Sequence, residues 1–205
     1  MRLSRVLLLT FLLMRPVCAA YGDPVSLGKL VDPTNFDIAG VKLYMTGQQV
    51  VDALQSTFGR SIVSKAKAEL SNSILRPGTQ YIKEIDLEVE GAKYMAFLVE
   101  TPDAAECVWQ VELWSRPLIT DADKAQFKAT VIEKYGPTTL GDSWCSKVNM
   151  NRGPFFPPAC ISESEMGFGM VPFTSRGRLL LKDIRPLNAQ DAAQKQKTTQ
   201  GPPKI

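Results

Sequence analysis

The sequence predicts an α+β fold built from two helix-plus-three-strand (αβββ) repeats, whose antiparallel meander sheets are each covered by a short amphipathic helix. Two segments carry apolar residues at positions i, i+4 and i+8, and a glycine follows each series directly. Strand-like alternation follows both segments, and the offset between them is 77 residues, so we interpret the plan as a duplication. The residues are Val50, Leu54 and Phe58 before Gly59, and Phe127, Val131 and Tyr135 before Gly136.

The first residues have the order of a secretory signal peptide. Arg2 and Arg5 precede the apolar run of residues 6–14, and small residues follow it. The run is too short for a membrane span, which needs about 20 apolar residues; a membrane anchor and lipidation at Cys18 are the alternatives. We therefore expect residues 1–20 to be removed, leaving a periplasmic or extracellular protein that is not inserted in a membrane.

The formal net charge of +3 arises entirely from this segment, which contains Arg2, Arg5 and Arg15 and no acidic residue. The side chains of the mature chain therefore balance in charge. A neutral chain gives no electrostatic reason to expect binding to nucleic acid or to an anionic membrane. An apolar content of 44% is sufficient for a hydrophobic core.

The first predicted unit covers residues 36–119 and follows an N-terminal arm, residues 21–35, that is rich in Gly, Pro, Asp and Ser. Residues 36–43 alternate as a short strand would. Thr46 and Gln49 then have the spacing of a capping box, in which a hydroxyl and an amide satisfy backbone N–H groups at the start of a helix.

Residues 60–80 are weakly patterned and predict at most a short strand at Ile62 and Val63. Three segments with strand-like alternation follow, and the turns between them are short enough for an antiparallel meander. The first segment alternates apolar residues with Glu84, Asp86, Glu88 and Glu90, which predicts an acidic outer face. The segments are residues 84–90, 94–100 and 107–114.

The second predicted unit covers residues 120–186. Its helix begins near Thr120, with Asp123 in the acidic version of the capping box, and ends before Pro137. Residues 187–205 have almost nothing apolar to bury, so we expect a flexible tail that includes at most a short helix at residues 188–197. The strand candidates of this unit are residues 140–148, 167–171 and 178–184.

The cysteines of the mature chain are odd in number, which leaves one unpaired if a disulfide forms. Cys145 and Cys160 bracket a turn-rich segment that brings its ends together, whereas Cys107 lies inside a strand pattern. We therefore expect a disulfide between Cys145 and Cys160. Cys107 is then a small buried hydrophobic residue or, alternatively, a reactive thiol.

The first helix segment carries a recognisable motif, Thr46-Gly47-Gln48-Gln49-Val50 followed by Leu54 and by Phe58-Gly59. This motif resembles that of the small outer-membrane lipoproteins of the β-barrel assembly machinery. A tandem copy of the helix-and-meander unit resembles the β-lactamase inhibitory proteins. The resemblance implies a tandem αβββ fold and a role in binding, either inhibitor-like or as an accessory factor of the cell envelope.

Two features that many catalytic and nucleotide-binding sites need are absent from the sequence. The chain contains no histidine, which removes the commonest general base and metal ligand, and no phosphate-binding glycine loop occurs. We therefore expect no catalytic residues, no metal and no cofactor. The function predicted is a non-catalytic binding or interaction protein, and the alternative is a histidine-free hydrolase or transferase that uses carboxylates.

The loop between the paired cysteines contains Arg152, Phe155 and Phe156 among several prolines. A stiff loop with aromatic and arginine side chains is suited to contact a protein partner, because it loses little entropy on docking. The alternative is that the two phenylalanines fold back and cover the end of a sheet. The sequence alone does not distinguish contact with a partner from cover for the sheet.

Replacing Phe155 and Phe156 together by serine distinguishes these two roles. The partner-binding role predicts a melting temperature close to that of the unchanged protein, because solvent-exposed anchors do not stabilise the free fold. Loss of buried aromatic rings instead lowers the melting temperature by roughly several degrees. Thermal unfolding followed by circular dichroism provides the measurement, and a large loss of stability would contradict the binding role.

Overall fold

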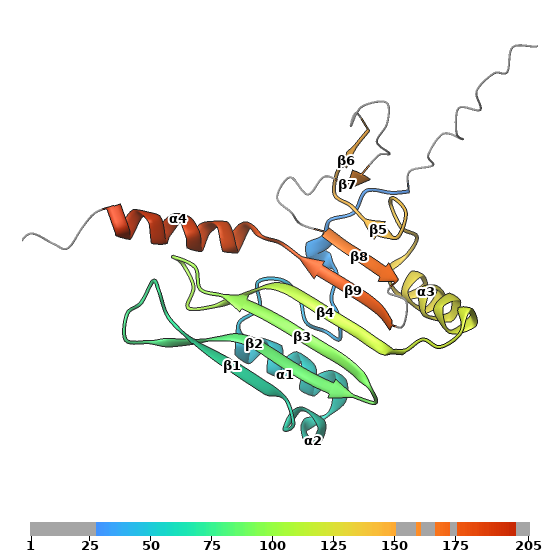
Figure 1. Ribbon diagram of the computed structural model, residues 1–205, viewed down its shortest axis with the longest axis horizontal. Coiled ribbons are helices and arrows are strands. Elements are labelled where there is room, and N and C mark those ends of the chain that lie inside the picture. The colour runs from blue at the N-terminus through green and yellow to red at the C-terminus, as the bar shows by residue number, and fades with distance from the viewer. Residues whose placement is uncertain (1–27, 151–158, 161–166, 173–175, 200–205) are drawn as a thin grey trace, which may run out of the picture.

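A computed structural model describes residues 28–150, 159–160, 167–172 and 176–199. They form an α+β fold around one antiparallel sheet of seven strands in the order β1-β2-β3-β4-β9-β8-β5, and β6 and β7 form a separate two-stranded ribbon (Figure 1). The strands are β1 (Lys67–Asn72), β2 (Gln80–Val89), β3 (Ala92–Val99), β4 (Cys107–Pro117), β5 (Ser143–Trp144), β6 (Val148–Asn149), β7 (Ala159–Cys160), β8 (Gly167–Pro172) and β9 (Arg176–Lys182). The helices are α1 (Gly47–Phe58), α2 (Arg60–Val63), α3 (Asp121–Tyr135) and α4 (Arg185–Thr199), and a 3-10 turn, η1, spans Pro33–Asn35.

The sheet contains the first predicted group of strands and most of the second, but the predicted strand at residues 140–148 is wrong, because only β5 from it joins this sheet and Val148 belongs to β6 in the ribbon. β2, β3 and β4 form the expected meander, and β5, β8 and β9 form a second antiparallel group. β4 pairs with β9, with Leu113 opposite Leu179, so the two groups are parts of one sheet rather than separate sheets. This pairing satisfies the backbone groups of two strands that would otherwise be exposed edges.

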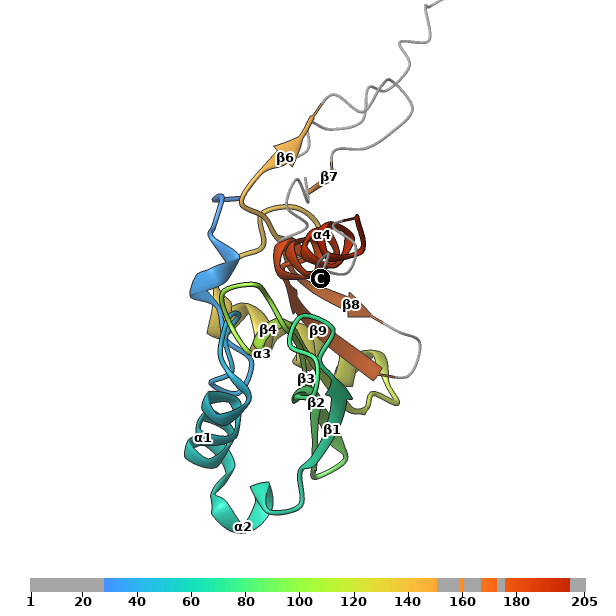
Figure 2. The ribbon, with the colours of Figure 1, turned by 90° about the vertical axis from the view of Figure 1, so that its left-hand side faces the viewer.

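The hydrophobic core lies between the sheet and the helices on one of its faces. Figure 2 shows α1 and α2 alongside that face. Alternation along β2 buries Ile85 and Leu87, and the helical spacing of α1 buries Val50 and Leu54 in the same core. In α3 only Val131 is fully buried, so the second helix covers the sheet less completely than the first.

The predicted helix ends are confirmed. Thr46 and Gln49 form the capping box of α1, and Thr120 and Asp123 form that of α3. Both helices end at the predicted glycines, which have φ angles of 85° and 80° that are strained for residues with a Cβ atom. These signals are local in the sequence, which is why the boundaries could be predicted.

The N-terminus of α1 also binds a carboxylate that is distant in the sequence, that of Glu106 in the loop directly before β4. Gly47 donates its N–H to Glu106 Oε1 at 3.0 Å, and Ile82 of β2 donates its N–H to Oε2 at 2.7 Å. A Cβ atom on Gly47 would lie 2.6 Å from Glu106 Oε1, so glycine is needed for this close approach. The negative charge is favourable at a helix N-terminus and attaches α1 to β2.

The prediction of a strand at residues 36–43 is wrong. Ile38 and Val41 form an isolated bridge around a tight two-residue turn, in which Ala39 and Gly40 have φ angles of 55° and 82°. Positive φ at both central residues is typical of the hairpin turn that reverses a chain in two residues. The alternation of apolar residues therefore marks the two arms of a turn rather than a strand.

The weakly patterned region also differs from the expectation. Ile62 and Val63 belong to α2, not to a strand, because the chain closes one helical turn directly after Gly59. β1 follows as an edge strand whose residues are almost all exposed, so it has no apolar alternation that the sequence could reveal.

The ends of the described chain pack against other elements. In the predicted arm, Gly28 and Val31 donate their N–H groups to the carbonyls of Thr139 and Cys145 at 2.8 and 2.9 Å. In the predicted tail, the sequence allowed at most a short helix at residues 188–197. The structure has a helix there, α4, which is longer at both ends. It contacts β3 and β4 and buries Gln190.

A buried carboxylate at the end of β3 holds the loop that connects β1 to β2. Glu100 is 0% exposed and accepts hydrogen bonds from the N–H groups of Ile74 and Leu75 at 2.5 and 2.7 Å. The Ser73 hydroxyl and the Gln190 amide of α4 donate to the same carboxylate. Burial alone would raise the pKa of Glu100, but these hydrogen bonds outweigh it, so the pKa is lowered.

The stabilisation from Glu100 should depend on pH. Its pKa is lower in the folded chain than in the unfolded chain, so its contribution is present above the unfolded value, about 4.3, and is lost as the pH falls through the folded pKa. We expect Glu100→Gln to lower the free energy of unfolding at pH 7 by about 2 kcal/mol or more, because an amide N–H₂ then faces backbone donors.

Urea denaturation of both proteins at pH 7 and at about pH 3 measures this difference, which should shrink at the lower pH. Glu69→Gln is the matched control, because Glu69 pairs with Lys83 on the exposed surface of β1. Such surface pairs contribute about 1 kcal/mol or less. Equal effects of the two substitutions at pH 7 would contradict the assigned role of Glu100.

Candidate functional site: a cleft between two helices

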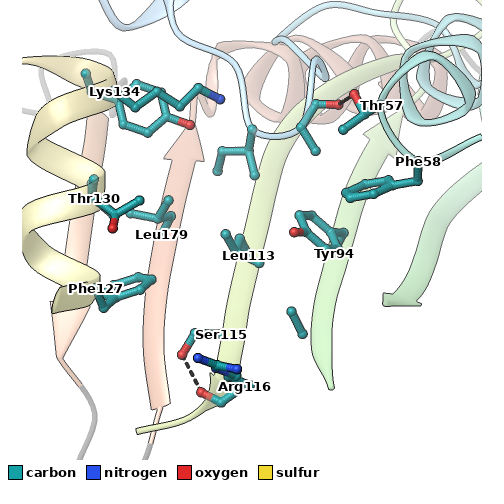
Figure 3. A pocket seen from close by; sticks show the side chains of 15 residues that line it. Thr57, Phe58, Tyr94, Leu113, Ser115, Arg116, Phe127, Thr130, Lys134 and Leu179 are labelled. Atoms are coloured by element: carbon teal, nitrogen blue, oxygen red, sulfur yellow. Dashed lines mark hydrogen bonds between the residues drawn. The ribbon is translucent and has the colours of Figure 1, made fainter. Parts of the chain in front are cut away.

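A cleft of about 390 Å³ lies over the sheet between α1 and α3 (Figure 3). Its floor comes from β3, β4 and β9, and its two walls come from the end of α1 and from α3. In the sheet register Tyr94 lies opposite Leu113, and Leu113 lies opposite Leu179. Directly opposed residues point to the same face, so these three side chains form a row across the floor.

Aromatic side chains form the two walls. Phe58, the last residue of α1, packs against Tyr94 with ring centroids 4.8 Å apart. On the opposite side the ring of Phe127 lies over Gly177 of β9, where a Cβ atom would be 2.4 Å from the Phe127 Cε1 atom. Gly177 is therefore required for the position of this ring. Each ring rests against the sheet rather than in the space between the helices.

The tight turn at residues 38–41 borders one end of the cleft, through Ile38 and Ala39. Thr57 of α1 donates its hydroxyl to the Ala39 carbonyl at 2.9 Å, and Tyr135 of α3 donates its hydroxyl to the Asp37 carbonyl at 2.6 Å. The same segment of backbone thus holds both helices. Their separation at this end is set by the turn.

Most polar groups in the lining already have partners. The hydroxyls of Thr57, Ser115 and Thr130 donate to backbone carbonyls, as does that of Tyr135. The Tyr94 hydroxyl is different, because no hydrogen bond to it occurs in the described part of the chain, and Figure 3 shows it directed toward Leu113. The cleft is therefore apolar, with one hydroxyl available to a ligand.

Two cationic side chains lie at the rim, and Figure 3 shows them near opposite ends. Lys134 pairs with Asp37 at 3.3 Å and lies 4.8 Å from the centre of the Tyr135 ring. Arg116 is the penultimate residue of the floor strand β4, and within the described residues its guanidinium group forms no hydrogen bond or ion pair, although its charge acts on the Asp123 carboxylate at the start of α3. The described lining contains no carboxylate.

The environment keeps the Tyr94 phenol neutral and the Lys134 ammonium charged at neutral pH. Burial raises the pKa of the Tyr94 phenol, so the hydroxyl remains a hydrogen-bond donor. Burial lowers the pKa of Lys134, but its contact with Tyr135 and the Asp37 carboxylate outweigh this effect, so the net shift is upward. The cleft thus combines neutral apolar walls with permanent positive charge at its rim.

The predicted disulfide between Cys145 and Cys160 is present, with Cα atoms 5.5 Å apart. It connects the segment after β5 to β7, and Val148 pairs with Cys160 in the ribbon that β6 and β7 form. The partner-binding candidates Arg152, Phe155 and Phe156 lie outside the described residues.

Cys107 is free and buried at the start of β4. Burial raises the pKa of its thiol, and the nearby Asp183 carboxylate raises it further. A protonated and inaccessible thiol is a poor nucleophile, which agrees with the interpretation of Cys107 as a packing residue.

The carboxylates that the sequence placed on β2 are spread along the strand. Asp86 pairs with Lys93 at 3.1 Å, and Glu88 is exposed. No group of three or more carboxylate, cysteine or histidine side chains is arranged to hold a metal in the described part of the chain. The cleft residues themselves carried only a partial signal in the sequence: Phe58 and Phe127 lie on the predicted helix stripes, but nothing indicated a gap between the helices.

No protein-family model matches the chain, and the comparisons with curated proteins and with solved structures likewise give no match. Among the described residues, none of the helices combines the length and the apolar character that crossing a bilayer requires. The case for a function therefore rests on the geometry of the cleft.

The contact between Phe127 and Gly177 can be tested by a double-mutant cycle. We expect Gly177→Ala to lower the free energy of unfolding by about 1–2 kcal/mol, because the new methyl group displaces the ring. In a Phe127→Ala background the same change should cost little. Urea denaturation of the four proteins gives the coupling energy, and equal costs of Gly177→Ala in both backgrounds would show that the ring does not occupy this position.

Proposed function

We propose that this protein is a non-catalytic binding protein of the periplasm or extracellular space, and that the cleft between α1 and α3 binds an apolar ligand. The observation that carries the proposal is the preformed row of Tyr94, Leu113 and Leu179 between two aromatic walls. Ligand sites are typically concave, largely apolar and about 300–1,000 Å³ in volume, with a few polar groups that orient the ligand.

The chemistry of the lining supports binding over the carboxylate-enzyme alternative. Acid–base catalysis by carboxylates needs at least one acidic group directed at the bound substrate. The described lining contains none, whereas the Arg116 guanidinium and the Tyr94 hydroxyl are groups that can orient a ligand. The disulfide supports the proposed location, because such bonds persist in oxidising compartments.

We also propose that the chain arose by duplication of an αβββ unit. A contact with a protein partner through Arg152, Phe155 and Phe156 remains part of the proposed binding function. Both helices have a threonine N-cap with a capping box and a glycine C-cap, and strands of one sheet follow each of them. These shared features support two related units, residues 36–119 and 120–186.

Binding of a neutral apolar fluorophore, N-phenyl-1-naphthylamine, tests the proposed cleft. We expect saturable binding with one site per chain, and Leu113→Gln should weaken it at least about tenfold by placing an amide in the floor. Thr130→Trp should have a similar effect, because it adds a ring at an exposed position of α3 that lines the cleft, without removing core contacts.

Leu70→Gln is the matched control, because Leu70 is 56% exposed on the edge strand β1 and is not part of the lining. Circular dichroism confirms that each variant is folded. Absence of saturable binding to the unchanged protein, or equal weakening by the control, would refute the proposed site.

A further inference from the structure

We infer that the ligand of this cleft is a long-chain carboxylate, that is, a single alkyl chain with an acidic head group, and that Arg116 binds the head group. The inference rests on the proposed binding function and deepens it. It follows from the hydrogen bonding of the backbone around the cleft, from the residues at the two ends of the cleft, and from the charges at its rim.

The backbone around the cleft favours a hydrocarbon chain over a peptide. The floor strands β3, β4 and β9 each have a paired neighbour on both sides, so their N–H and C=O groups are used within the sheet. The walls are helices, whose backbone groups are bonded internally. A peptide lying on this surface would bury backbone groups without partners, at a cost that a hydrocarbon chain does not incur.

The side chains of the lining lead to the same conclusion. The hydroxyls of Thr57, Ser115 and Thr130 already donate to carbonyls of the protein. A ligand with many polar groups, such as a sugar, would therefore find few donors among these side chains. An alkyl chain matches the floor of leucine and aromatic side chains, which gains from the removal of apolar surface from water.

The two ends of the cleft differ, and the difference orients the ligand. At one end the turn at residues 38–41 connects α1 to α3 through hydrogen bonds from Thr57 and Tyr135. At the other end lie Ser115 and Arg116, near the end of β4, and Figure 3 shows Arg116 at the end of the lining away from Lys134 and Thr57. A chain that enters past Arg116 places its tail toward the turn and its head group at the guanidinium.

The charges at the rim select an anion and favour Arg116 over Lys134 as its partner. Lys134 already pairs with the Asp37 carboxylate, so an added anion there would meet a neutralised cation. Arg116 has no such pair among the described residues, and its planar guanidinium can donate two parallel hydrogen bonds to one carboxylate. The described lining contributes no acidic side chain that would repel the head group, and Asp123, whose carboxylate interacts with the charge of Arg116, is not part of that lining.

A comparison of dodecanoate with its methyl ester tests this inference, because the two ligands share the chain and differ in charge. Affinities are measured by displacement of N-phenyl-1-naphthylamine and by calorimetry below the micelle-forming concentration. We expect dodecanoate to bind the unchanged protein about tenfold more tightly than the ester. Arg116→Gln should reduce this preference to about twofold or less, leaving the affinity for the ester unchanged.

Lys134→Gln is the matched control and should keep most of the preference for the acid. Equal affinities for acid and ester in the unchanged protein would overturn the inference while leaving the proposed apolar site intact. A parallel loss of both ligands in Arg116→Gln, or a larger loss of preference in Lys134→Gln, would overturn the role of Arg116. Failure of the fluorophore and both ligands to bind would instead refute the proposed function itself.

Discussion

The short turn before α1 determines how the two helices lie on the sheet. Ala39 and Gly40 both have positive φ, and the Gly40 N–H donates to the Asp37 side chain at 2.9 Å, which stabilises the reversal. The carbonyls of Asp37 and Ala39 accept hydrogen bonds from α3 and α1, respectively. The backbone of this turn therefore separates α1 from α3 at one end of the cleft. The rest of the cleft extends from the turn along the sheet, between the two helices.

Carboxylates hold the other junctions of the fold, and two of them, Glu100 and Asp183, are fully buried. Glu100 fixes the loop between β1 and β2, Glu106 joins α1 to β2, and Asp183 joins Tyr44 and Arg185 where β9 passes into α4. A buried carboxylate is costly unless its oxygens are well satisfied, so each arrangement tolerates few alternative geometries. Burial raises the pKa of Asp183, but its hydrogen bonds to Arg185 and Tyr44 lower it more, so the group is ionised.

The features that could be predicted from the sequence are those with short-range signals. The caps of α1 and α3, the alternation in β2 and the spacing of Cys145 and Cys160 each depend on residues close together in the chain. The pairing of β4 with β9 joins segments far apart in sequence, and no residue pattern marks it. The cleft depends on that pairing and on the turn at residues 38–41, so it could not be found from the helix stripes alone.

The positions of the aromatic rings support the proposed binding site over a fault in packing. Protein interiors are close-packed, and an unfilled space loses dispersion contacts along its whole lining. The rings of Phe58 and Phe127 are large enough to occupy part of the space, yet each is held against the sheet, one by Tyr94 and the other by the absence of a side chain at Gly177. Walls held in place in this way lose little conformational entropy when a ligand enters, which favours binding.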